Sequence, residues 1–142
     1  MDLLELNSCC RLLRERRSLL IYASCIDVER PGLPESVAPD SVRASVCMER
    51  EQFNVVSLKV ASILARVELE ELAVLTVDGS PHCVQLHHAV EEAVKIAGGV
   101  KPRHLVLAEG EVVEVPARAV KTARYLSKVA RLLTSSSAGG PP

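Results

Sequence analysis

Aromatic side chains are almost absent from this sequence, which has one Phe, two Tyr and no Trp among 142 residues. So few rings leave little surface on which bases stack, and a net charge of −1 provides no excess of cations for a phosphate backbone. We therefore expect no binding to nucleic acid. No apolar run approaches the ~20 residues that a bilayer span requires. The N-terminal segment MDLLELNSCCRLLRERR also lacks the apolar stretch of a signal peptide. These absences predict a cytoplasmic protein without membrane contact.

Asn and Gln are scarce, since the chain contains only Asn7, Asn54, Gln52 and Gln85. A low content of thermolabile side chains is typical of thermophile proteins. This matters for the five cysteines, because hyperthermophiles form disulfides inside the cell whereas most cytosols keep thiols reduced. Disulfide pairing therefore stays open at this point.

Several familiar site motifs are also missing. The sequence contains neither G-x-G-x-x-G nor a phosphate-loop motif, so a nucleotide cofactor is not expected. It also contains no C-x-x-C, and the cysteine spacings match no standard metal-ligand motif. Any metal or redox site must therefore be assembled by the fold.

What the sequence does contain is a regular alternation of strands and helices. Short apolar runs predict five strands, at residues 19–24, 42–46, 72–77, 104–108 and 111–115. Glu109-Gly110 joins the last two as a β-hairpin. This order predicts an α/β three-layer sandwich with a mainly parallel, mixed sheet and a C-terminal β-hairpin and helix. The runs at 19–24 and 72–77 are the most apolar, so we expect them to be parallel neighbours inside the sheet.

Helices are expected from Asp2 to Arg17, from Glu49 to Val67, after Ser80, and from Pro116 to Leu133 with Val129 and Leu133 facing inward. The segment from Ile26 to Asp40 contains three prolines and predicts an irregular loop. We expect one domain over residues 1–134 and a disordered tail over 135–142.

The most informative stretch runs from Leu72 to Ala97, a predicted strand, tight loop and helix. Ser80 is a good N-cap and Pro81 suits the first helical position, which places Cys83 in the first turn. Unpaired N–H groups and the helix dipole favour a thiolate there, so Cys83 is expected to have a depressed pKa. The loop Asp78-Gly79-Ser80 is also suited to holding an anion at the helix start.

Three cysteines follow three predicted strands. Cys25 and Cys47 come directly after strands, and Cys83 lies in the turn after a third. If these strands are parallel, the three thiols meet at one edge of the sheet, where α/β proteins place their ligands. With Cys10 or His82 as a further ligand, this set would suit an iron–sulfur cluster or zinc in a redox context.

Two other interpretations remain open. Cys83 and His87 lie one helical turn apart, so a small enzyme with Cys83 as nucleophile and His87 as base is one alternative. The cysteines are otherwise ordinary buried hydrophobes, since free cysteine is among the most buried residue types. In that case the chain is a structural subunit whose helix from Tyr125 to Leu133 docks on a larger protein partner or a second copy.

The segments TVDGSPHCVQLHHAVEEA and ARYLSKVARLL resemble a small uncharacterised archaeal α/β family that is sometimes labelled iron–sulfur or ferredoxin-like. The resemblance covers most of the chain from Ser18 onward. It implies a single α/β domain and carries over no ligand residue.

Overall fold

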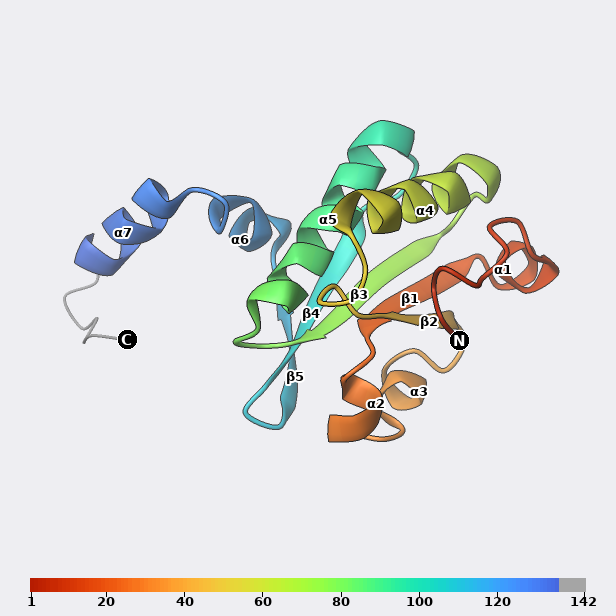
Figure 1. Cartoon of the computed structure of the whole chain (residues 1–142), viewed down its shortest axis with the longest axis horizontal. Helices are drawn as coiled ribbons and strands as arrows, with labels where there is room; N and C mark the ends of the chain where they lie inside the picture. The colour runs from red at the N-terminus through yellow and green to blue at the C-terminus, as the bar shows by residue number, and fades with distance from the viewer. Residues whose placement is uncertain (136–142) are drawn as a thin grey trace.

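The computed structural model describes residues 1–135 and shows a five-stranded mixed sheet (Figure 1). The strands are β1 (Ser18–Ala23), β2 (Val42–Val46), β3 (Glu71–Val77), β4 (Pro102–Ala108) and β5 (Glu111–Val115). Their order across the sheet is β2-β1-β3-β4-β5, with parallel pairing from β2 to β4 and antiparallel pairing between β4 and β5. The predicted fold class is confirmed, with helices on both faces of the sheet.

β1 and β3 are adjacent and parallel in the sheet interior, as their apolar sequences predict. Leu19 pairs with Leu72 and Ile21 with Val74, and all four side chains are almost fully buried. A strand covered on both faces buries successive side chains alternately on each, which explains why neither run alternates with polar residues.

Two long helices cover one face of the sheet. They are α4 (Phe53–Arg66) and α5 (Pro81–Ala97), which lie side by side (Figure 1). Their apolar stripes pack against side chains of β1 and β3. The helical residues of this core include Val56, Val60, Ile63, Leu86, Ala89 and Val90. The predicted start of α4 at Glu49 is wrong, because residues 47–51 form a turn in which Glu51 N donates to Cys47 O at 2.8 Å. Neither these helices nor any other within residues 1–135 is long and apolar enough to cross a membrane.

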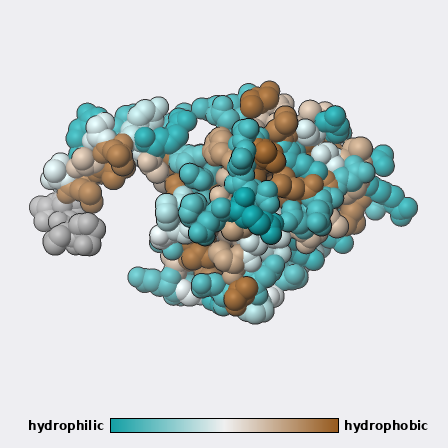
Figure 2. Space-filling view, viewed as in Figure 1, coloured by the Kyte–Doolittle hydropathy of each residue, from teal (hydrophilic) through white to brown (hydrophobic). Residues whose placement is uncertain are grey.

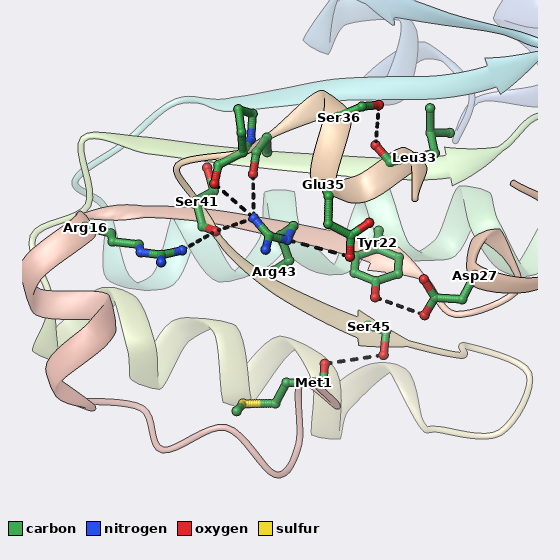
Figure 3. A network of polar contacts seen from close by, with 12 residues as sticks. Met1, Arg16, Tyr22, Asp27, Leu33, Glu35, Ser36, Ser41, Arg43 and Ser45 are labelled. Atoms are coloured by element: carbon green, nitrogen blue, oxygen red, sulfur yellow. Dashed lines mark hydrogen bonds and ion pairs between the residues drawn. The ribbon is translucent and has the colours of Figure 1, made fainter. Parts of the chain in front are cut away.

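Two short helices lie over the opposite face, α2 (Ile26–Glu29) and α3 (Leu33–Val37). The expectation of an irregular loop at residues 26–40 is therefore wrong in part. Arg43 of β2 fixes this segment, since its Nη1 donates to the backbone oxygens of Ala38, Pro39 and Ser41 (Figure 3). Three carbonyl groups on one guanidinium hold the returning chain against the sheet edge.

The predicted helix from Asp2 to Arg17 is also wrong in its first half, because only α1 (Arg11–Arg16) is helical. Asp2 Oδ1 accepts from Leu4 N at 2.8 Å, and Asn7 Oδ1 accepts from Cys9 N at 3.0 Å. Such side-chain hydrogen bonds compete with helical ones and favour turns.

The C-terminal segment leaves the body of the molecule. β5 is the edge strand beside β4, and α6 (Ala117–Thr122) and α7 (Leu126–Ser135) follow it (Figure 1). The prediction that Val129 and Leu133 face inward is wrong, since α7 contains no buried residue. Its apolar side chains are visible on the projecting arm in Figure 2. Of the tail predicted over 135–142, residues 136–142 lie outside the described residues.

Candidate functional site

The chain leaves β1 and β3 toward opposite faces of the sheet. After β1, Ile26 and Leu33 of α2 and α3 join the core on one face, whereas after β3, Leu86 of α5 joins the core on the other. Because β1 and β3 are neighbours, their carboxyl ends form the point where the winding reverses. Ligands of open α/β sheets bind in the crevice at this point.

A small cavity of about 90 Å³ lies at these strand ends, and its wall contains all three cysteines predicted to meet there. Cys25 and Cys47 come from the ends of β1 and β2, and Cys83 comes from the first turn of α5. Ser80 and His82 also line the cavity. The structure therefore brings these side chains together, as parallel pairing of the three strands requires.

Cys83 is the buried thiol of the group, with 7% of its surface exposed. Its place is fixed by the predicted helix start: Ser80 is the N-cap, Pro81 opens the helix, and Ser80 Oγ accepts from Cys83 N at 3.3 Å. The side chain packs with Leu75 and Leu107 on the face that α2 and α3 cover. Cys83 is thus held rigidly at the base of the cavity.

Cys25 is the exposed cysteine of the cavity and lies at the start of α2. Partial burial of its sulfur raises the pKa of Cys25, and the charge of Cys83 and a hydrogen bond with it raise that pKa further. Cys25 and Cys83 both line the same cavity. Cys25 keeps its proton to higher pH than an ordinary cysteine does.

The four-ligand set predicted for a metal is only partly assembled. Cys10 lies in a different cavity, beside Ser41 and Val42 at the start of β2, because α1 places it at the opposite end of the sheet. Among residues 1–135, no three Cys, His, Asp or Glu side chains are grouped closely enough to hold a metal ion. The cavity residues as arranged do not fit a preformed zinc or cluster site.

Only part of the loop predicted to hold an anion, Asp78-Gly79-Ser80, reaches the cavity. Ser80 lines the cavity, whereas Asp78 and Gly79 are exposed and do not. Gly79 has φ of +94°, a left-handed conformation that glycine adopts without strain. Anion binding by this loop stays a prediction.

His87 points away from Cys83 and into the core beneath α5. Its Nε2 is 2.7 Å from Thr76 Oγ1, and its Nδ1 is 2.8 Å from His104 Nδ1. Both ring nitrogens are occupied, so neither is left to accept a proton from Cys83. Burial, followed by the charges of His104 and His88, lowers the pKa of His87 to about 3. The pairing of Cys83 with His87 as base does not form.

Sequence reasoning missed the partners of His87. His104, from β4, is 1% exposed, and its Nε2 is 2.6 Å from Glu91 Oε1 of α5. Thr76, His87, His104 and Glu91 thus form a continuous chain of hydrogen bonds between α5 and the sheet. The available signal was a histidine and a threonine within two apolar strands, where buried polar groups need partners.

Comparison with known proteins places the fold in a family. No curated protein and no solved structure matches the chain. A family model described as Rossmann-like domain matches residues 10–138, which span the whole sheet with α4 and α5. The chain belongs to this family of Rossmann-like domains.

Proposed function

We propose that this chain is a thiol redox protein in which Cys25 and Cys83 exchange between a dithiol and a disulfide. The observation that carries the proposal is that an exposed and a buried thiol line one cavity at the winding reversal of the sheet. The crevice there is the standard ligand position of the fold. The Cys25 sulfur is accessible to a partner, whereas Cys83 is buried.

The reaction is a two-step exchange with a disulfide-bearing partner. The Cys25 thiolate attacks one sulfur of that disulfide, forming a mixed disulfide and releasing the other sulfur as a thiolate. The Cys83 thiolate then attacks the Cys25 sulfur, which forms the Cys25–Cys83 disulfide and releases the second thiolate. The two cysteines lose two electrons and two protons, and the partner is reduced to two thiols.

The environment of Cys25 sets how the reaction depends on pH. The thiolate is the nucleophile, and the pKa of Cys25 is raised by burial and by Cys83. We therefore expect the first step to accelerate as pH rises above neutrality. A thiol of high pKa is also a stronger nucleophile once it has lost its proton.

Binding of zinc or an iron–sulfur cluster is the second candidate, as the cysteines that follow the strands predict. The observation in its favour is that Cys25, Cys47, Cys83 and His82 line one cavity. Such a group would require the side chains to draw closer than they lie here, since no three are grouped closely enough to hold a metal ion among the described residues. Cys47 separates the two candidates, because a dithiol needs only Cys25 and Cys83.

The test is a redox titration of the full chain in glutathione buffers, with differential alkylation and peptide mapping. We expect two thiols to disappear together and a disulfide to map to Cys25 and Cys83. Cys25→Ser should abolish it, whereas Cys9→Ser is the matched control, since Cys9 is exposed and outside the cavity. A disulfide that involves other cysteines, or none at all, would contradict the proposal.

The metal candidate is tested on the same variants. The protein is purified without oxygen, and its iron and zinc are measured per chain. Stoichiometric metal that is lost in Cys47→Ser would support the metal site over the dithiol. A Cys47→Ser variant that still forms the Cys25–Cys83 disulfide, with wild-type protein free of metal, would support the dithiol.

A further inference from the structure

A second and larger cavity lies beside α5, toward its C-terminal half. Its volume is about 260 Å³, and its walls come from one face of α5, from α6 and from Arg124. At ~30 Å³ per molecule, this is room for about nine waters. The space suits the charged group of a small molecule.

Four cations line this cavity: Lys95 from α5, and Arg118, Lys121 and Arg124 from the α6 segment. Within residues 1–135, none of the four forms an ion pair with a carboxylate. Burial, and next the charge of Arg124, lower the pKa of His88 in the same wall. Four cations that outnumber the carboxylates around a concave space, and form no ion pair with them, favour an anionic ligand.

Glu91 and Glu92 are the acidic groups that face these cations. Glu91 differs from a surface carboxylate because His104 holds it at 2.6 Å from inside the core. Its side chain is 29% exposed, so it connects the buried hydrogen-bond chain to the cavity.

An ionised Glu91 fixes the direction of that chain. Glu91 Oε1 accepts from His104 Nε2–H, His104 Nδ1 accepts from His87 Nδ1–H, and His87 Nε2 accepts from the Thr76 hydroxyl. Every buried donor and acceptor in the chain is then satisfied with both imidazoles neutral. Glu91 is thereby oriented at the cavity wall through one oxygen.

We propose that this cavity binds a small oxyanion, the phosphate or carboxylate group of a metabolite. Glu91, which His104 holds at the cavity wall, restricts where the anion lies, because two negative charges repel each other. Lys121, Arg118 and Arg124 supply the charge-assisted hydrogen bonds to the anion. The site is independent of the cysteine cavity.

The test is calorimetric titration of the full chain at low ionic strength with sulfate, phosphate and acetate. We expect sulfate to bind, and its affinity to fall as the ionic strength is raised, because salt screens the attraction between exposed charges. Tighter binding of phosphate and sulfate than of acetate would identify a phosphate ligand, and the reverse order a carboxylate.

Two variants of matched charge test the position of the site. Lys121→Gln removes a cavity cation, whereas Lys128→Gln removes an identical charge from α7, outside the cavity. We expect the first to weaken sulfate binding about tenfold and the second to change it less than twofold. Equal weakening by both, or no binding of any of the three anions, would overturn the site.

Glu91→Gln tests the acidic part of the wall. The amide keeps an oxygen that accepts from His104 and removes the negative charge. We expect sulfate binding to tighten about tenfold, because the repulsion between Glu91 and the anion is lost. Unchanged affinity would show that the anion does not bind beside Glu91 and would overturn the site.

Discussion

Acidification should destabilise this protein through His87 before its carboxylates begin to titrate. The ring is 4% exposed, and both of its nitrogens are hydrogen-bonded inside the core. Burial and the neighbouring His104 and His88 lower the pKa of His87 to about 3. In the unfolded chain the same ring has the ordinary histidine pKa of about 6.5.

The size of the effect follows from these two values. Above pH 6.5 the ring is neutral in both states and contributes its full stability. As pH falls below 6.5 the unfolded state binds a proton that the folded state excludes, so the free energy of unfolding decreases by about 1.36 kcal/mol per pH unit. The loss is about 2–3 kcal/mol by pH 4.5 and about 5 kcal/mol once pH reaches the folded pKa of about 3.

The assay is guanidinium unfolding followed by circular dichroism at several pH values between about 7.5 and 4.5. His87→Gln is the matched variant, because an amide keeps a donor and an acceptor but binds no proton. We expect its stability to depend on pH by one proton less than that of the wild type. An identical slope in both proteins would refute the reasoning. So would an NMR titration in which the folded His87 ring protonates near 6.5.

Three further outcomes are expected. Cys83→Ser should lower the pKa of Cys25, which is measured from the alkylation rate of Cys25 against pH. That pKa should stay above the pKa of an ordinary cysteine, because burial is the larger cause of the shift. An unchanged pKa would show that the two thiols do not interact. Thr76→Val should cost about 1–3 kcal/mol of stability in chemical unfolding, because His87 Nε2 loses its buried partner. Thr76→Ser keeps the hydroxyl and should cost only about 0.8 kcal/mol for the lost methyl group. Equal losses in the two variants would contradict this. Removal of α7 should change stability by less than about 0.5 kcal/mol, because none of its residues is buried, and a larger drop in melting temperature would reveal packing that it contributes.

The sheet was predictable because its strands are short apolar runs separated by turn residues. The hairpin at Glu109-Gly110 and the adjacency of β1 and β3 both follow from such local patterns. Parallel pairing then brings Cys25, Cys47 and Cys83 to one cavity, so the thiol cluster was predictable from strand ends alone.

The terminal helices were less predictable, because the apolar spacing of a helix does not reveal what the helix packs against. Leu3 and Leu6 are buried as a helical stripe would require, yet side-chain hydrogen bonds from Asp2 and Asn7 keep their segment in turns. α7 has an apolar stripe of the same kind but lies clear of the sheet. Tertiary contacts, not local pattern, decide both cases.

The polar core was hidden for a related reason. His87 and Cys83 lie one helical turn apart, which favoured a thiol–imidazole pair. The choice between Cys83 and His104 as partner depends on where β4 lies relative to α5, 17 residues from His87 along the chain. No spacing within one helix contains that information.

The edge strand β5 has a consequence for solubility. Among residues 1–135, no strand pairs with its outer side, and Val112 and Val113 are exposed between Glu111 and Glu114. Charged side chains on such an edge discourage edge-to-edge aggregation of chains. A hydrogen bond from Arg103, and then its charge, lower the pKa of Glu114. The Glu114 carboxylate therefore stays ionised in acid that neutralises an ordinary glutamate. The ion pair across the sheet therefore protects the chain from β-aggregation under the same acidic conditions in which the buried histidine weakens its fold.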